Sequence, residues 1–330
     1  MARPKRLKVD NEVGFYHLLS RTVGKEFYFG DVEKEKLLEI IKYYSSYYFV
    51  KVTGLCLMSN HFHLLIKSEP ENIYTNEEVK QRILKYVDKY KPLYTEGEVS
   101  CIDENERIKK YRDKMGNISE YMRDIKQTFS RWYNKTHNRT GYLWGDRFKS
   151  ILLEKGESLL NCLAYIDLNP IRAKIVKKPE DYRWSSIGYR IFSNNKDNFL
   201  SFDGVFSESQ LKELNKKQLI QFYRYFVYKC GNIKRLNITE LEEGKDPHNI
   251  KSSIKDETYA AELKRGFKIP KSDLMLGRIK FFSNGMVIGS KKFLMEAYAK
   301  FGGEIIQKKD RKTYKTGINK NILSLRRLNC

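Results

Sequence analysis

The chain has 330 residues and a hydrophobic content of 41%, enough for one large core or two smaller ones. Its 63 lysines and arginines against 41 aspartates and glutamates give a formal net charge of +22, which favours polyanionic partners, with nucleic acid as the leading candidate. Five scattered cysteines without a CxxC pair argue against a disulfide framework or a zinc ribbon, and no stretch approaches about 18 uninterrupted apolar residues. We therefore expect a basic cytoplasmic protein without a membrane span.

The first predicted elements are a strand, a helix and two further strands. Residues 13–22 are aromatic and apolar enough for a strand, and residues 31–49 repeat apolar positions at helical spacing behind Asp31, a favourable N-cap residue. The runs VKVTGLCLM (50–58) and HFHLLIKS (61–68) are β-like and break at Ser59-Asn60, which indicates a hairpin. Residues 69–116 are charged and indicate a helical insertion with much solvated surface.

A helix, a strand and a closing helix follow. NISEYMRDIKQTFSRWYNKTHNR (117–139) has the pattern of an amphipathic helix, DRFKSILLE (146–154) that of a strand, and ESLLNCLAYIDLNP (157–170) that of a helix ending around Pro170. The order β-α-β-β-α-β-α predicts an α+β fold, a ferredoxin-like split βαβ antiparallel sheet with an added C-terminal helix.

A smaller region follows this domain. The polar stretch SNNKDN (193–198) separates residues 1–192 from a basic accessory region, residues 193–330, which we expect to be mixed helical. The dipeptide Asn284-Gly285 stands between β-rich runs and favours a type I′ turn, so we expect a hairpin near residues 278–289.

The stretch LCLMSNHFHLLIKS (55–68) holds two of the five histidines. Because residues i and i+2 of a strand share a face, His61 and His63 should project together, with Phe62 on the other side. Two imidazoles so placed can reach one divalent metal ion, although a third ligand must come from elsewhere in the fold. An isolated pair of this kind is more often a pair of ordinary strand histidines, solvated or hydrogen-bonded.

Two later segments each offer a tyrosine and a possible ligand at helical spacing i, i+4. One pair is Tyr165 and Asn169, and the other is Tyr133 and His137. A tyrosine can act as the nucleophile of phosphoryl transfer once a metal ion polarises the phosphate. Spacing alone does not choose between the two pairs.

Several motifs together resemble a known family, the REP-associated tyrosine transposases of the HUH single-tyrosine superfamily, which act on single-stranded DNA. The motifs are MSNHFHLLIKS, GYLWGDRFKS, YIDLNPIRAKIV and PEDYRWSS, and with the N-terminal strand region they cover most of residues 1–190 in the family's order. The resemblance implies that Tyr165 is the nucleophile and that Asn169 joins His61 and His63 in holding Mg²⁺ or Mn²⁺. Tyr133 and His137 then have no assigned chemistry.

The resemblance also implies an activity, that of a metal-dependent endonuclease and strand transferase on single-stranded DNA hairpins, through a 5′-phosphotyrosine intermediate. The protein would be a monomer or a homodimer, associated with the nucleoid when it binds DNA. Basic residues in or beside the motifs are expected to contact phosphates: Arg21, Lys126, Arg131, Arg147 and Lys149. Two alternatives remain, a non-catalytic nucleic-acid binding protein on the same fold and a metal phosphodiesterase that uses water as its nucleophile.

Overall fold

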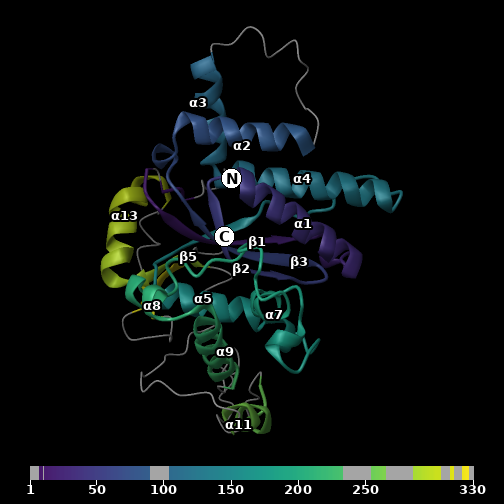
Figure 1. The fold of residues 1–330 in the computed structure, drawn as a ribbon, viewed down its shortest axis with the longest axis vertical. Helices are drawn as coiled ribbons and strands as arrows, with labels where there is room; N and C mark the ends of the chain where they lie inside the picture. Colours follow the sequence, from purple (N-terminus) through teal and green to yellow (C-terminus); the bar gives the residue numbers. More distant parts are fainter. Residues whose placement is uncertain are drawn as a thin grey trace.

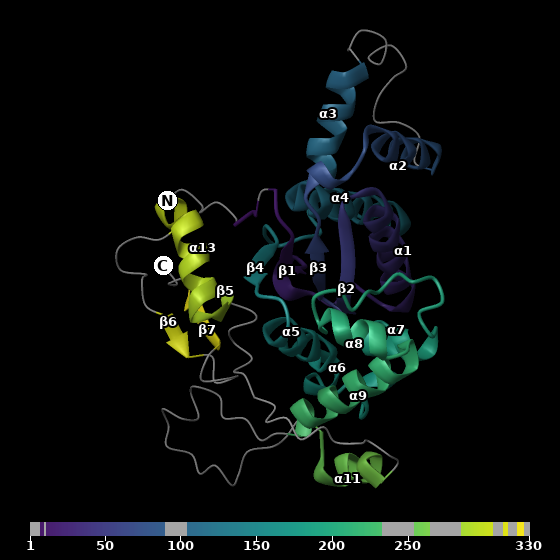
Figure 2. The same cartoon turned by 60° about the vertical axis from the view of Figure 1, so that its left-hand side comes forward.

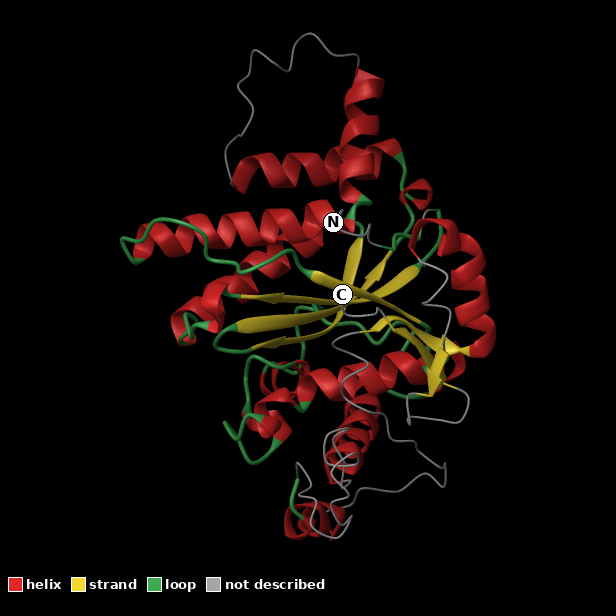
Figure 3. Ribbon diagram, turned by 180° about the vertical axis from the view of Figure 1, so that it is seen from behind, coloured by secondary structure: helices red, strands yellow, loops and turns green. Residues whose placement is uncertain are grey.

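The computed structural model describes residues 7–9, 11–89, 104–232, 254–264, 285–305, 313–315 and 322–326. A central sheet lies between helices, as Figure 1 shows. Figure 3 gives the same arrangement from behind, with the strands in yellow. No helix in the described part of the chain is long and apolar enough to cross a membrane.

The first four strands of the sheet have the predicted split βαβ topology. The elements are β1 (Gly14–Arg21), α1 (Asp31–Tyr47), β2 (Val50–Leu57), β3 (His61–Ser68), α4 (Ile118–Thr136), β4 (Lys149–Leu153) and α5 (Glu157–Asp167). The strands lie in the order β2-β3-β1-β4, and each neighbouring pair is antiparallel. The ferredoxin-like prediction is therefore confirmed for this part of the fold.

The β2–β3 connection is the predicted tight hairpin. Leu57 pairs with Phe62, and the Met58 N–H donates to the His61 carbonyl at 2.8 Å, which closes the turn over residues 59 and 60. The predicted cap of α1 is wrong by one position, because Gly30 is the N-cap and Asp31 is the first helical residue. There the Asp31 carboxylate still lies in the first turn, where the helix dipole favours negative charge.

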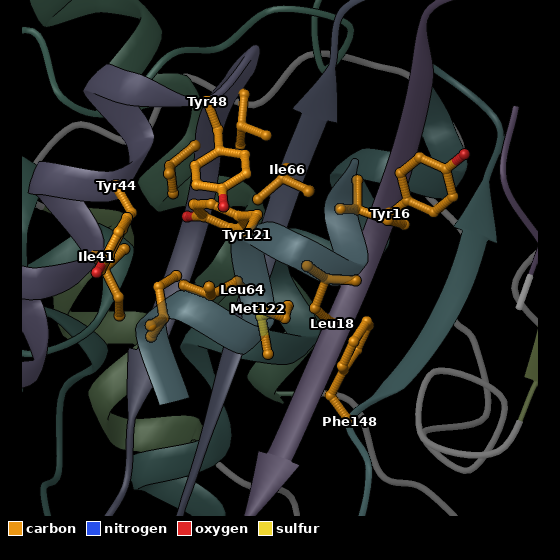
Figure 4. Close-up of a cluster of buried hydrophobic side chains, with 14 of the residues drawn as sticks. Tyr16, Leu18, Ile41, Tyr44, Tyr48, Leu64, Ile66, Tyr121, Met122 and Phe148 are labelled. Carbon is orange, nitrogen blue, oxygen red and sulfur yellow. The ribbon is translucent and has the colours of Figure 1, made fainter. Parts of the chain in front are cut away.

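The two faces of the sheet carry separate cores. Helices α1 and α4 cover one face, where Tyr16, Leu18, Leu64 and Tyr121 are buried together, as Figure 4 shows. Helix α5 covers the other face, and Figure 2 shows it on the opposite side of the strands from α1 and α4. Successive strand residues point to opposite faces, so the sequence alternates between the two cores.

The predicted charged insertion is helical. It contains the 3₁₀ turn η2 (Glu71–Ile73), α2 (Asn76–Lys89) and α3 (Glu104–Met115), while residues 90–103 lie outside the described part. The insertion is not wholly solvated, since Val79 and Met115 are fully buried against the α1–α4 core.

The region after residue 192 contributes to the same sheet. Strand β5 (Gly285–Ser290) pairs in parallel with β4, and β7 (Ile322–Arg326) and β6 (Thr313–Lys315) follow, so the full order is β2-β3-β1-β4-β5-β7-β6. Residues 278–284 of the expected hairpin lie outside the described residues; the described half is β5, whose sheet neighbours are β4 and β7. The other elements are η1 (Val23–Lys25), α6 (Asn169–Arg172), η4 (Pro179–Asp181), α7 (Ser186–Phe192), α8 (Glu208–Glu213), α9 (Lys216–Asn232), α11 (Asp256–Lys264) and α13 (Lys291–Ile305).

Candidate active site

His61 and His63 lie on the α5 face of the sheet, and Phe62 is buried in the opposite core. Their ring centroids are 5.1 Å apart, with an interplanar angle of 80°. His61 is at the end of β3, opposite Arg21, and is partly exposed, whereas His63 lies two residue pairs further into the strand and is only 2% exposed. The strand periodicity thus brings the two imidazoles together as expected.

Both imidazoles are neutral at pH 7. Burial, together with the positive charge of Arg21, lowers the pKa of His61 to about 4. Burial lowers the pKa of His63 well below its ordinary value, and the neighbouring His17 and His61 act in the same direction. Neutral imidazole is the form that binds a metal ion, so neither ring has to lose a proton before it can bind one.

Each imidazole has a hydrogen-bond partner at Nδ1. For His61 it is the side-chain oxygen of Asn60, at 2.6 Å. The amide nitrogen of Asn60 donates to the Lys25 carbonyl at 2.7 Å, which turns the Asn60 oxygen toward the ring. For His63 the partner is another imidazole, since Nε2 of His17 lies 2.8 Å from Nδ1 of His63. These partners leave Nε2 of both rings as the nitrogen for a ligand.

Helix α5 brings Tyr165 to this face. The Tyr165 ring stands edge-on to His63, with centroids 5.9 Å apart and an interplanar angle of 88°, and also edge-on to His17, at 6.1 Å and 75°. Every residue of α5 from Ser158 to Asp167 is buried, and Tyr165 itself is 8% exposed. A helix buried along its whole length holds its side chains in fixed orientations.

Asn169 begins the short helix α6, just after a break in the helix. Helix α5 ends at Asp167 and the break falls at Leu168; Asn169 is itself helical, although a proline disfavours the α conformation of the residue before it. The Asn169 amide nitrogen donates to the carbonyls of Tyr165 and Ile166, at 3.2 and 3.0 Å. Its oxygen Oδ1 is therefore the side-chain atom that can coordinate a metal ion.

Arg172 also approaches Tyr165. Its Nη1 donates to the Tyr165 carbonyl at 2.8 Å, and its guanidinium carbon lies 4.8 Å from the centre of the Tyr165 ring. Arg172 is among the charges that lower the pKa of His63, after burial and the histidines. A fixed positive charge therefore lies beside both the phenol and the imidazoles.

The second tyrosine pair belongs to the other core. The rings of Tyr133 on α4 and of His137, the C-cap residue of α4, stack at 4.2 Å, and Nε2 of His137 lies 3.0 Å from a carboxylate oxygen of Glu33 on α1. Tyr133 is buried with the residues beneath α1 and α4, so the sheet separates it from His61 and His63. This pair is not part of the His61–His63 cluster.

The imidazoles of His61 and His63 suit a divalent metal ion only if an amide oxygen or another oxygen joins them as a further ligand. Among the described residues, no group of three or more His, Cys, Asp or Glu side chains is placed to share one metal ion. Two neutral imidazoles and an amide oxygen such as that of Asn169 would make a mixed nitrogen–oxygen set, of a kind that several divalent ions accept.

The basic residues expected to contact DNA divide between the two faces. Arg21 pairs with His61 and Lys149 pairs with Leu19, so these two exposed residues lie on the histidine face. Arg147 is exposed just before β4. Lys126 and Arg131 are on α4, across the sheet, and Lys126 donates to the Asp146 carbonyl at 2.9 Å.

Sequence reasoning missed His17. It sits in the apolar run GFYHLLSR of β1, where nothing but its residue type distinguishes it from neighbours that form the core. Histidine is rare in this chain, with five copies, and a polar residue inside an apolar strand was the one available signal.

Comparisons with known proteins bear on the segment that holds the histidines. A family model described as "Transposase IS200 like" matches residues 13–92, which include His17, His61 and His63 but not Tyr165 or Asn169. The resemblance to single-tyrosine transposases is confirmed over this segment. A solved structure of a REP-associated tyrosine transposase bound to a REP hairpin aligns with 63% of this chain and 96% of its own, at 12% identity and a TM-score of 0.39. No curated protein matches the chain.

Proposed function

We propose that this chain, which carries an IS200-like transposase segment at residues 13–92, is a strand transferase for single-stranded DNA. In this proposal Tyr165 is the nucleophile, and the reaction passes through a covalent 5′-phosphotyrosine. His61, His63 and Asn169 would hold Mg²⁺ or Mn²⁺.

The observation that carries the proposal is the position of Tyr165 against His63. The two residues come from α5 and β3, about a hundred residues apart in sequence, and their rings meet edge-on at 5.9 Å. A tyrosine nucleophile that is assisted by a metal ion has to lie beside the groups that hold the ion, and Tyr165 lies beside the imidazole pair. A protein that only bound DNA would have no physical need to bury these groups together.

Each group has a distinct part in the proposed chemistry. When bound, the divalent ion would polarise the scissile phosphate and offset the charge that develops on it. The imidazoles, being neutral, offer nitrogen lone pairs without bringing positive charge of their own. Arg172 orients Tyr165 through its backbone carbonyl and adds a fixed positive charge beside the ring.

The proposed transfer balances without an external energy source. The Tyr165 oxygen forms a bond to phosphorus while the bond from phosphorus to the 3′-oxygen breaks. The proton lost by the phenol is matched by the proton gained by the 3′-oxygen, which leaves a free 3′-hydroxyl. Because one phosphodiester replaces another, a 3′-hydroxyl can attack the phosphotyrosine and rejoin the strand.

The proposed substrate is single-stranded DNA that folds into hairpins. The net charge of +22 favours a polyanion, and the exposed Arg21 and Lys149 lie on the same face as His61. Phosphates bound there would lie beside the proposed nucleophile.

The test is a denaturing-gel assay with 5′- and 3′-labelled single-stranded hairpins from the flanks of the gene, each incubated with Mn²⁺ or EDTA. Wild type is compared with Tyr165→Phe and with Tyr133→Phe. The two tyrosines are well matched, because both are nearly buried, at 8% and 6% exposure, and both contact a histidine ring. We expect a metal-dependent protein–DNA adduct in wild type and Tyr133→Phe and none in Tyr165→Phe.

Other outcomes identify the alternatives. Metal-dependent cleavage without an adduct would point to a water nucleophile. Tight hairpin binding that survives EDTA, with no cleavage in wild type, would point to a binding protein without catalysis.

A further inference from the structure

His17 is an imidazole in an otherwise apolar part of the sheet. It is 1% exposed and lies in the middle of β1, directly opposite Leu65 on β3 and Ile151 on β4. Its ring lies nearly parallel to that of His63, with centroids 5.1 Å apart and an interplanar angle of 15°. A leucine at this position would avoid the cost of taking a polar ring out of water, so core packing does not account for a histidine.

The bond between the two imidazoles constrains where their protons are. Nε2 of His17 and Nδ1 of His63 are 2.8 Å apart, and a hydrogen bond requires one of these nitrogens to carry the hydrogen and the other to accept it. If His17 donates, neutral His63 carries its own hydrogen on Nε2 and has no lone pair for a ligand. If His17 accepts, His63 is protonated on Nδ1, and its Nε2 lone pair is free.

We propose that His17 is a positioning residue that accepts the hydrogen of His63 Nδ1 and thereby keeps the Nε2 lone pair of His63 available to the divalent ion. This inference rests on the proposed function and deepens it. Asn60 has the corresponding place beside His61, where its side-chain oxygen accepts from Nδ1 at 2.6 Å. Each imidazole of the pair then donates its Nδ1 hydrogen to its own acceptor, and Nε2 of both rings carries no hydrogen.

The physical effect of such a partner is known in outline. An acceptor at the second nitrogen fixes the tautomer and the ring orientation of a metal-binding histidine, and its removal typically lowers metal affinity about 10–100-fold. The two rings lie nearly parallel, so a rotation of the His63 ring would break its hydrogen bond with His17.

Two substitutions separate the hydrogen bond from ring packing. His17→Phe keeps a flat ring of similar size but has no acceptor. His17→Gln loses the ring, yet its amide oxygen can occupy roughly the position of Nε2 and accept from His63. If packing is what matters, Phe is the milder change; if the hydrogen bond matters, Gln is.

The experiment uses the full chain and two measurements. Two-bond ¹H–¹⁵N spectra of metal-free protein labelled at its five histidines report the tautomer of His63, and free Mn²⁺ measured by electron paramagnetic resonance during titration reports affinity. We expect the Nδ1-protonated form in wild type, an Mn²⁺ affinity about 10–100-fold weaker in His17→Phe, and an affinity close to wild type in His17→Gln. Hairpin binding in EDTA should be the same for all three proteins, which controls for folding.

The inference is overturned if His63 of wild type is protonated on Nε2, if His17→Phe binds Mn²⁺ as wild type does, or if His17→Gln is as weak as His17→Phe. The adduct assay separates this failure from failure of the proposed function. An adduct in wild type with unchanged Mn²⁺ affinity in His17→Phe contradicts the role of His17 alone. Mn²⁺ binding that depends on His17, without any adduct, contradicts strand transfer alone.

Discussion

Tyr223 on α9 donates its hydroxyl hydrogen to a carboxylate oxygen of Asp167, the last residue of α5, across 2.5 Å. The other carboxylate oxygen accepts from the backbone N–H of Ile187 on α7, at 3.2 Å. Asp167 is fully buried, and burial raises its pKa to about 6 in spite of these donors. One carboxyl group thus ties the end of the helix that carries Tyr165 to two helices that follow it in the chain.

Loss of the hydrogen bond between Tyr223 and Asp167 should make the end of α5 less rigid. Tyr223→Phe leaves a buried carboxyl without one of its donors, which typically costs about 1–3 kcal/mol. We expect the free energy of unfolding in urea to fall by that amount, with slower adduct formation at Tyr165. A double-mutant cycle with Asp167→Asn should give a coupling energy of about 0.5–3 kcal/mol. Additive effects of the two substitutions would contradict the direct interaction.

The histidine face should account for the electrostatic part of DNA binding. Arg21→Ala and Lys149→Ala each remove a positive charge from that face, so each should reduce the slope of log affinity against log salt by about 0.7–0.9. The measurement is a salt titration of hairpin binding in EDTA, on a Tyr165→Phe background. Arg131→Ala, an equally exposed change on α4 across the sheet, should leave the slope unchanged. If Arg131→Ala reduced the salt slope by the same amount, DNA would not bind on the histidine face alone.

Gly54 lets α5 approach the sheet. A Cβ atom at this position of β2 would lie 2.2 Å from Cδ1 of Leu163 on α5 and 3.0 Å from the Ser186 hydroxyl. Overpacking of a filled core typically costs about 1–3 kcal/mol, so Gly54→Ala should lower the free energy of unfolding by about that much. Adding Leu163→Ala provides room for the methyl group, and the double variant should be more stable than the sum of the two single effects predicts. If the effects of the two substitutions on stability were strictly additive, the contact between Gly54 and Leu163 would not limit how closely α5 packs on the sheet.

Glu69 should make stability depend on pH. Burial alone would raise the pKa of its carboxyl, but hydrogen bonds from Tyr74, Lys67 and Lys51 outweigh burial and hold the pKa below its ordinary value. A lowered pKa in the folded state means that the carboxylate stabilises the protein above the unfolded pKa of about 4.3, and that this contribution is lost as the pH falls through the folded value.

The comparison that tests this is urea unfolding of wild type and Glu69→Gln at several pH values. The stability difference should be largest near neutral pH and should shrink as the pH falls below about 4.3. A difference that stays constant or grows on acidification would be inconsistent with a depressed pKa at Glu69.

Local sequence was sufficient to predict the helices and strands up to Asp167 and to predict that His61 and His63 share a face. Strand periodicity alone predicts that His61 and His63 share a face and that Phe62 leaves it, because side chains alternate along any strand. Helix α1 was placed correctly by its apolar spacing, while its cap was off by one residue, since Gly30 and Asp31 are both acceptable at an N-terminus. The order of elements then restricted the first four strands to a single familiar topology.

The partners of the histidines were decided only by the tertiary structure. His17 meets His63 because β1 and β3 pair in one particular register, and a shift by one residue would turn His17 to the opposite core. Tyr165 rather than Tyr133 lies at the histidines because α5 packs on their face of the sheet and α4 on the other, and the sequence of a helix does not say which face it will cover. The addition of β5, β7 and β6 to the edge of the sheet likewise depends on the pairing of β5 with β4, two strands more than a hundred residues apart. Alternation along a strand is a property of the chain itself, whereas register and helix placement arise from contacts between distant segments, which no local pattern encodes.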